Sequence, residues 1–325
     1  MKSGELRAMS LHTHVVGHPI AHSLSPVIFA AAGVDIHCER ADVERGHLAD
    51  FLAGQGREDR GLSVTMPLKK EALSVCTHID DLAVRVGAIN TIVVGKIDCA
   101  EDVGAQRGRQ YQWIPNAHRR QLANTPVEDT AVYGCNTDVA GIVAAIRETL
   151  GDEATFSNAV ILGSGATASS ALAAVQELGQ PHTLICSRRH VMQGSVFAVA
   201  QRLGVPVEYA PLTHAHEYME HADLVISTLP AHVADTLAQR LRGAHVPNLA
   251  VLDVSYDPYP SALSTAVIAA GGIDIPGYEM LIHQGIEQAR IFSGREPDAD
   301  AIHATVLAHV QRRHAADQDS AQEGR

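Results

Sequence analysis

The feature that most constrains the fold is a glycine-containing turn near the middle of the chain. An apolar run, Val160–Leu162, precedes the turn Gly163–Ala168, and an alanine-rich helical pattern, Ser169–Leu178, follows it. In a G-x-G-x-x-A turn between a strand and a helix, the first glycine permits the tight turn and the second lets a pyrophosphate approach the backbone. The N–H groups and the helix dipole then face the phosphates. The stretch predicts a nucleotide site, with a plain turn as the alternative.

Short apolar strands alternate with helical patterns through the rest of this half of the chain. The expected strands are Thr183–Cys186, Val207–Tyr209, Leu224–Ser227 and Leu249–Val254, and the expected helices are Val191–Leu203, Val233–Leu241 and Ala262–Ala270. Such alternation is typical of a doubly wound parallel sheet. The sequence therefore predicts an α/β protein with a Rossmann-like domain, and a length of 325 residues leaves room for a second domain.

The N-terminal half is less regular. We expect a strand at Val15–Gly17, and then a helix with Ser25 as its N-cap and Pro26 at its first position. A second helix is expected to begin at Pro67. The polar segment Gly95–Asp129 has no sustained period and is interpreted as a long hairpin or mobile insertion. Residues 1–11 are expected to be frayed, and residues 315–325 disordered.

Three polar features of this half have both a structural and a chemical interpretation. Ser23 and Ser25 flank a predicted helix N-terminus, which suits a carboxylate ligand, although capping alone explains Ser25. Lys69 and Lys70 oppose the dipole of the helix predicted at Pro67, so they are either needed for another purpose or are simply solvated. Asp138 precedes a helical pattern and either caps it or has a functional role.

Composition excludes several classes of partner. The formal net charge of −12 argues against binding to nucleic acid or an anionic membrane. A small anion could still be bound by a local cluster. No secretory signal or membrane-length apolar run is present, so we expect a cytoplasmic protein. The five cysteines include no C-x-x-C pair and are expected to be reduced thiols. None of the 19 histidines has metal-ligand spacing, so no metal is expected. The sequence leaves the oligomeric state open, with a homodimer as one alternative.

Seven stretches, in their shared order and spacing, resemble the shikimate dehydrogenase family. They are Ser23–Pro26, Val64–Lys69, Gly87–Thr91, Asn136–Asp138, the glycine turn, Asp253–Pro258 and Gly277–Gln284. The resemblance implies a substrate-binding domain over residues 1–137, to which residues 277–325 return. An NADP-binding Rossmann-like domain would lie over residues 138–276, with the active site in the cleft.

The implied reaction is the reversible reduction of 3-dehydroshikimate to shikimate with NADPH, in the chorismate pathway that leads to aromatic amino acids. By the resemblance, Lys69 and Asp138 match the catalytic pair that assists proton transfer. The implied substrate contacts are Ser23, Ser25, Ser63, Thr65, Asn90, Tyr256 and Gln284. The implied cofactor contacts are Gly163, Ser164, Gly165, Ala166, Thr167, Ser187, Arg188, Arg189, Val254 and Gly277. The arginine pair suits a 2′-phosphate and predicts NADP.

Three departures from the family pattern keep alternatives open. Ser63 stands where much of the family has asparagine, Ala166 replaces a frequent glycine, and the 95–129 segment has no common counterpart of that size. The small Ser63 could make room for the additional hydroxyl of quinate, so a quinate or quinate/shikimate dehydrogenase is one alternative. A non-catalytic NADP-binding regulator is another. Retention of both Lys69 and Asp138 counts against a regulator, because a sensor needs no proton transfer.

Overall fold

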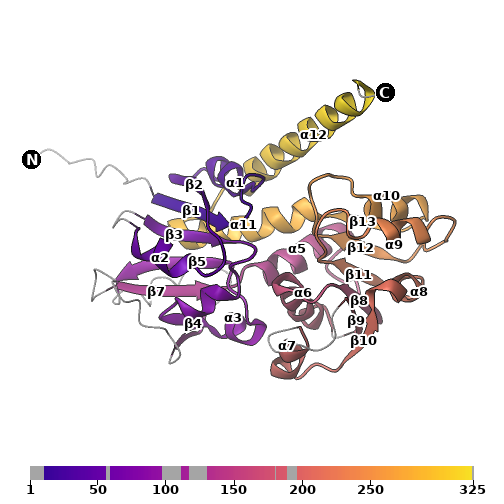
Figure 1. The fold of residues 1–325 in the computed structure, drawn as a ribbon, viewed down its shortest axis with the longest axis horizontal. Coiled ribbons are helices and arrows are strands. Elements are labelled where there is room, and N and C mark those ends of the chain that lie inside the picture. Colours follow the sequence, from indigo (N-terminus) through magenta and orange to yellow (C-terminus); the bar gives the residue numbers. More distant parts are fainter. Residues whose placement is uncertain are drawn as a thin grey trace, which may run out of the picture. The chain divides into compact units, whose positions relative to one another are not determined.

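The computed structural model describes residues 11–55, 59–96, 111–116, 130–179, 181–188 and 196–323. The chain divides into two compact units, whose elements Figure 1 shows along the chain. Unit 1 comprises Met1–Ala83, Ile89–Cys135 and Gly285–Thr305, and unit 2 comprises Val84–Ala88, Asn136–Gln284 and Val306–Arg325. Residues 277–284 and 306–325 thus group with unit 2, whereas the sequence predicts that they belong with the substrate-binding domain.

Unit 1 contains a seven-stranded mixed sheet with the order β2-β1-β3-β5-β7-β4-β6. Strand β1 pairs in parallel with β2 and β3, whereas β5 is antiparallel to both β3 and β7. The strands are β1 (Leu11–Gly17), β2 (Ile36–Asp42), β3 (Asp59–Val64), β4 (His78–Asp80), β5 (Thr91–Lys96), β6 (Trp113–Pro115) and β7 (Thr130–Cys135). The helices are α1 (Ser25–Ala31), α2 (Leu48–Ala53), α3 (Asp81–Val86) and the 3-10 turn η1 (Glu71–Ser74).

Two expectations for unit 1 are wrong in detail. Ser25 is the first residue of α1 rather than its N-cap, because Leu24 holds the cap position without a side-chain bond. Pro67 does not open an α-helix. A turn over residues 66–70 leads instead into η1, whose Glu71 carboxylate accepts bonds from the backbone N–H groups of Gly46 and Leu48. The chain around Lys69 is therefore fixed by tertiary hydrogen bonds rather than by a helix.

The polar 95–129 segment is described only in part. Lys96 ends β5, and residues 97–110 and 117–129 lie outside the described residues. Between these gaps β6 pairs antiparallel with β4, so the described part extends the sheet of unit 1 at its edge. The Tyr111 hydroxyl donates to Glu287 Oε1 at 2.7 Å, which ties the segment to α11 (Gly277–Ser293). Of residues 1–11, which are expected to be frayed, residues 1–10 lie outside the described residues, and Leu11 begins β1.

Unit 2 contains the predicted doubly wound sheet. Its six strands are parallel, in the order β10-β9-β8-β11-β12-β13. The strands are β8 (Asn158–Leu162), β9 (His182–Ser187), β10 (Val207–Pro211), β11 (Leu224–Ser227), β12 (Ala250–Asp253) and β13 (Ile273–Pro276). The first strand, β8, therefore lies between the second and the fourth, and the order reverses between β8 and β11. The α/β prediction is confirmed.

Helices connect these strands as the sequence predicts, with small differences at their ends. They are α5 (Asp138–Leu150), α6 (Ala166–Glu177), α7 (Val196–Leu203), α8 (Ala215–Met219), α9 (Asp235–Arg240) and α10 (Ala262–Ala269), with the 3-10 turn η3 (Leu212–His214). After α11, the last helix, α12, runs from Ala299 to Glu323. The expectation of disorder from residue 315 is thus wrong through Glu323. No helix of the described chain is long and apolar enough to cross a membrane.

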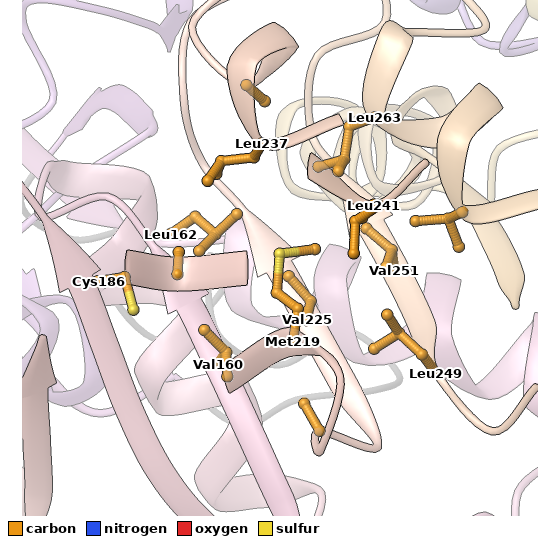
Figure 2. Packing of buried hydrophobic residues seen from close by; sticks show 14 of the residues in the cluster. Val160, Leu162, Cys186, Met219, Val225, Leu237, Leu241, Leu249, Val251 and Leu263 are labelled. Carbon is orange, nitrogen blue, oxygen red and sulfur yellow. The ribbon is translucent and has the colours of Figure 1, made fainter. Parts of the chain in front are cut away.

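One face of the unit 2 sheet forms a continuous apolar core with helices α8, α9 and α10. Figure 2 shows Val160, Leu162, Val225 and Val251 on neighbouring strands beside helical side chains such as Leu237. Alternate residues of a strand point to the same face, which is why Val160 and Leu162 contribute together. Each such side chain stabilises the fold by about 1.5–3 kcal/mol when fully buried. This packing fixes the strand ends that carry the candidate site.

Two carboxyl groups lie on neighbouring strands of this sheet, Asp253 at the last residue of β12 and Asp274 at the second residue of β13. Asp253 is 3% exposed and accepts from the Ser261 hydroxyl at 2.7 Å. Asp274 Oδ2 accepts from the Tyr259 hydroxyl at 2.9 Å, and its Oδ1 is buried without a hydrogen bond from any described group. Burial raises the pKa of both carboxyls, and the charge of Asp274 raises that of Asp253 further. Each carboxyl therefore loses its proton at a higher pH in the folded protein than in the unfolded chain.

We expect Asp274→Asn to raise the melting temperature at pH 7. A carboxyl whose pKa is higher in the folded state stabilises the fold below the unfolded pKa, and this stabilisation is lost as the pH rises through the folded pKa. The neutral amide keeps an acceptor for Tyr259 and has no charge to desolvate. Thermal unfolding at pH 7 and pH 4.5 should show a larger gain at pH 7, whereas exposed Asp152→Asn should show none. An equal or absent gain at both pH values contradicts the prediction.

Candidate functional site

The glycine turn of unit 2 has the geometry that its sequence requires. Gly163 has φ +116°, a left-handed conformation that side chains disfavour, and a Cβ there would lie 2.4 Å from Thr228 Oγ1. Thr228 follows β11, and its hydroxyl donates to the carbonyl of Leu162 at 2.8 Å. The end of β8 is therefore joined to the end of β11, where the strand order reverses. Ligands of open α/β sheets bind outside the carboxyl ends of strands at such a point.

The second half of the turn leaves room for an anion. Gly165 is exposed, and a Cβ built on it meets no atom within 4 Å. It is the N-cap of α6 and, as a glycine, has no side chain that could bond to the first N–H groups of the helix. Ser164, Ala166 and Thr167 are half-buried around it, whereas Ala168 is completely buried in the packing of α6. The first N–H groups of α6 thus border open space, as phosphate binding requires.

The other predicted cofactor residues also follow the carboxyl ends of strands. Ser187 ends β9, is 2% exposed, and its carbonyl accepts from the Tyr209 hydroxyl at 2.9 Å. The next residue, Arg188, is exposed, and Arg189 lies outside the described residues. Val254 follows β12 and donates its N–H to the carbonyl of Ser227. Gly277 follows β13, where an added Cβ would lie 2.2 Å from the carbonyl oxygen of Asp253. Ser187, Arg188, Val254 and Gly277 therefore all lie at the carboxyl ends of strands of the parallel sheet.

Asp138 is the first residue of α5 and is 2% exposed. The capping interpretation is not needed, because the Asn136 side-chain oxygen accepts from the backbone N–H of Val139 at 3.2 Å. Thr137 donates its hydroxyl to the carbonyl of Gln284 at 3.1 Å, which brings the start of α5 to α11. The buried carboxylate therefore lies on the segment that contacts Gln284. Tyr256, the remaining predicted residue of unit 2, is half-buried in the loop after β12.

Unit 1 brings three of the predicted serines together. The Ser25 hydroxyl lies 3.4 Å from the Ser63 hydroxyl and accepts from Ser23 Oγ at the same distance. Ser25 and Ser63 are buried, and Ser23 is half-buried. Arg40 donates two bonds to the carbonyl of Ser23 and holds the loop in place. Because Ser25 does not cap α1, its hydroxyl is directed toward Ser63 and forms part of a hydroxyl cluster.

Lys69 and Asn90 are linked through the backbone of unit 1. Lys69 is half-buried, and its carbonyl accepts from the N–H of Ile89 at 2.8 Å. The neighbouring Leu68 is completely buried and anchors the turn. The carbonyl of Asn90 accepts from the N–H of Val64, one residue before Thr65, at 2.7 Å. The two loops that carry Thr65, Lys69 and Asn90 are therefore held against each other by main-chain hydrogen bonds.

Two residues that the sequence analysis missed orient Asn90. Thr91 donates its hydroxyl to Asn90 Oδ1 at 2.9 Å, which fixes the amide orientation. Gln288 is completely buried and donates through Nε2 to the carbonyl of Asn90 at 2.9 Å and to the Thr91 hydroxyl at 3.0 Å. Gln288 follows Gln284 by one turn of α11. That i, i+4 spacing is the sequence signal that could have identified it.

The strand order and the glycine turn define unit 2 as a dinucleotide-binding type of domain. Residues 15–92 match the family model described as shikimate dehydrogenase substrate binding domain, and residues 277–307 match that described as shikimate 5'-dehydrogenase C-terminal domain. The shikimate dehydrogenase (NADP(+)) of Rubrobacter xylanophilus is 30% identical over 302 residues, which cover 89% of this chain and 92% of the relative.

Solved structures agree with these matches. The crystal structure of Mycobacterium tuberculosis shikimate dehydrogenase has a TM-score of 0.69 at 30% identity, covering 91% of this chain and 98% of the other. The Thermus thermophilus enzyme, solved with NADP(H) and shikimate, has a TM-score of 0.68 and covers 92% and 99% of the two chains. At 23% identity it supports the fold alone. The chain belongs to the shikimate dehydrogenase family, whose members are oxidoreductases acting on a CH–OH group.

Proposed function

We propose that the protein is an NADP-dependent shikimate dehydrogenase that reversibly reduces 3-dehydroshikimate to shikimate. The observation that carries the proposal is the 30% identity to an NADP-dependent relative along nearly the whole of both chains. Family membership is supported further by the position of the predicted site residues. The glycine turn lies where the strand order reverses, and the buried Asp138 opens α5.

Unit 2 would hold the cofactor. The open space beside Gly165 and the first N–H groups of α6 fit a pyrophosphate, and Gly163 satisfies the tight turn. Ser187 and the exposed Arg188 stand at the strand end where dinucleotide folds recognise the ribose. NADPH, when bound, supplies the hydride for the carbonyl carbon of the substrate. Ala166 replaces a frequent glycine without blocking the turn, because it is half-buried within the first turn of α6.

Residues of the chain would then donate and accept the proton. Hydride addition leaves negative charge on the ketone oxygen, so a proton donor must stand beside it. In the proposal the Lys69 ammonium donates this proton, and in the reverse direction the amine accepts it. The Asp138 carboxylate orients the ammonium, balances its charge and accepts a bond from a ring hydroxyl. Hydrogen bonds hold the segment around each residue within its own unit, as a residue with a positioned functional group requires.

The hydroxyl cluster of unit 1 would bind the substrate. Ser23 and Ser25 would donate to its carboxylate, with Tyr256 as a further contact. Ser63, Thr65, Asn90 and Gln284 would contact ring hydroxyls, and a buried polar site of this kind rejects rings that lack the matching groups. The orientation of Asn90 by Thr91 and Gln288 supports this assignment, because a fixed amide presents a defined donor.

A single assay tests the proposal. Purified protein is mixed with shikimate or quinate, each with NADP or NAD, and the formation of reduced nicotinamide is followed. The proposal expects the highest kcat/KM for shikimate with NADP. Higher efficiency with quinate would favour the second candidate, a quinate dehydrogenase, which the small side chain of the buried Ser63 supports. Absence of turnover with every pair of substrate and cofactor would contradict both enzyme activities and favour the non-catalytic NADP-binding regulator.

We expect Ser63→Ala to weaken shikimate binding by about 1 kcal/mol, roughly fivefold in KM, which corresponds to one net hydrogen bond. Ser63 is buried beside Ser25, and its hydroxyl offers only part of the hydrogen-bonding capacity of asparagine. The matched variant Ser63→Asn restores the side chain frequent in the family and should lower the KM for shikimate relative to Ser63→Ala. An unchanged KM in Ser63→Ala would show that the serine does not contact the ring.

Cofactor choice gives a prediction for Arg188. No acid follows β9 to bind a ribose 2′-hydroxyl, and the guanidinium of Arg188 suits a 2′-phosphate. We expect NADP to be preferred over NAD by at least about tenfold in kcat/KM, about 1.4 kcal/mol, and Arg188→Ala to remove most of that preference. Exposed Arg242→Ala should leave it unchanged. Equal use of both cofactors by the unmodified protein, or full preference after Arg188→Ala, would contradict the assignment.

A further inference from the structure

Three metal-ligating side chains meet on unit 2 outside the residues discussed so far. Glu148 lies in the last turn of α5, and Glu279 and His283 lie one turn apart on α11. His283 Nε2 is 2.6 Å from Glu148 Oε2, and one ligand atom from each of the three residues lies within 4.8 Å of the other two. The i, i+4 spacing puts Glu279 and His283 on the same face of α11, which is directed toward α5. The three side chains thus converge from two helices.

The spacing of these atoms suits a small cation. Zinc binds imidazole nitrogen at about 2.0–2.1 Å and carboxylate oxygen at about 2.0–2.2 Å, so two of its ligand atoms lie roughly 3–3.5 Å apart. The present His283–Glu148 separation would have to widen by less than about 1 Å to admit such an ion. Glu148 can make this adjustment because its side chain is 56% exposed, whereas His283 is only 23% exposed. One flexible ligand and one confined ligand are therefore present.

The electrostatic surroundings favour a cation at this place. Glu148 lies at the negative end of the α5 dipole, where an acidic side chain is unfavourable. Two carboxylates from different helices therefore converge on one imidazole. A divalent cation would relieve the repulsion between them.

The backbone makes the helix pair a firm support for such a site. Gly141 of α5 approaches α11 so closely that a Cβ would lie 2.8 Å from the carbonyl oxygen of Met280. The Thr137 hydroxyl bond to the carbonyl of Gln284 holds the same two helices at the start of α5. The ligand-bearing segments are thus fixed relative to each other before any ion binds, and this preorganisation lowers the entropic cost of binding.

We propose that Glu148, Glu279 and His283 bind a divalent first-row transition-metal cation of the Zn²⁺ or Co²⁺ type, with water completing its coordination. One imidazole nitrogen and two carboxylate oxygens select this class over Mg²⁺ and Ca²⁺, which prefer oxygen ligands alone. The ion would connect the C-terminal turn of α5 to the first turns of α11. Its role would be structural, because the ion would hold together two helices that carry predicted site residues. These are Asp138 at the start of α5 and Gln284 directly after His283 on α11. The proposal differs from the expectation of no metal. The sequence shows the i, i+4 pair of Glu279 and His283, but Glu148 is remote from them along the chain.

Calorimetric titration of the full, untagged chain with ZnCl₂ or CoCl₂ tests the site. We expect one saturable site per chain, with affinity reduced by about tenfold or more in Glu148→Gln, a change at an exposed side chain that preserves its shape. His283→Asn should produce a loss at least as large. The matched control is Glu208→Gln, which alters an exposed His182–Glu208 pair of 3.1 Å on the same unit. This control should bind like the unmodified chain.

The same titration identifies the outcomes that would overturn the proposal. Equal affinity in the unmodified chain, Glu148→Gln and His283→Asn would place any bound metal elsewhere. An equal loss in Glu208→Gln would indicate diffuse binding by surface histidines. A concentration of about 1 mM metal lies far above the dissociation constants of structural sites. Absence of saturable binding up to this concentration would show that Glu148 and His283 form an ion pair and that the three residues bind no metal. Metal binding is read directly, so the result is independent of whether the protein reduces 3-dehydroshikimate.

Discussion

Lys69→Ala should reduce kcat by at least about a hundredfold while the KM for shikimate changes far less. Removing a general acid or base costs about 10²–10⁴-fold in the chemical step, whereas the lost methylenes contribute little to binding a polar ring. Lys69 is half-buried in a turn held by Leu68 and by the backbone bond from Ile89, so its truncation leaves the anchoring contacts in place. Steady-state kinetics with shikimate and NADP measures both parameters.

A matched lysine stands directly beside it. Lys70→Ala removes the same charge and the same number of atoms from the next position of the turn, so it reports the effect of altered net charge alone. We expect Lys70→Ala to retain kcat within about threefold, and both variants to keep the cooperative unfolding of the unmodified protein. Near-normal turnover in Lys69→Ala, or an equal loss in Lys70→Ala, would remove Lys69 from the role of proton donor.

The sheet of unit 2 could be predicted from the sequence because its signals are local. Runs such as Val160–Leu162 are buried on both faces of a parallel sheet, and a glycine turn between a strand and a helix has few other uses. The turn at Pro67 could not be predicted in the same way. A proline after a strand is compatible with a helix start, and the contacts of Glu71 with Gly46 and Leu48 that favour the turn are not visible in sequence.

The site shows the same division between local and long-range information. Motif positions such as Lys69 and Asp138 could be named from the sequence because the family pattern includes them. The expectation that Ser25 caps α1 is wrong because an N-cap is a local explanation, whereas the Ser25 hydroxyl lies beside that of Ser63 at the end of β3. The spacing from Gln284 marks Gln288 as a candidate, but its partner Asn90 could not be predicted because it lies far away in the chain. The same holds for Glu148, which is remote from Glu279 and His283. Single-chain patterns thus locate motifs better than they locate partners.

Asp138→Asn should also lose at least about a hundredfold in kcat, because the neutral amide cannot balance the lysine ammonium although it has nearly the same shape. The side chain is 2% exposed at the start of α5, where Asn136 already caps Val139, so the substitution removes no helix cap. Thermal unfolding of the variant and of the unmodified protein distinguishes a loss of turnover from a loss of stability. Asp138→Glu, which restores the charge on a longer side chain, should recover part of the lost turnover.

The combination of the two substitutions gives the sharper result. If Lys69 and Asp138 act together in proton transfer, either substitution alone already disables the pair. The double variant Lys69→Ala/Asp138→Asn should then lose about as much kcat as the worse single variant. If the two roles were independent, the two losses in kcat of about a hundredfold each would multiply to a loss of roughly ten-thousandfold. A multiplicative loss would separate Asp138 from proton transfer and leave it a substrate contact. Near-normal turnover in Asp138→Asn alone would show that the Asp138 carboxylate is needed neither for proton transfer nor for substrate contact.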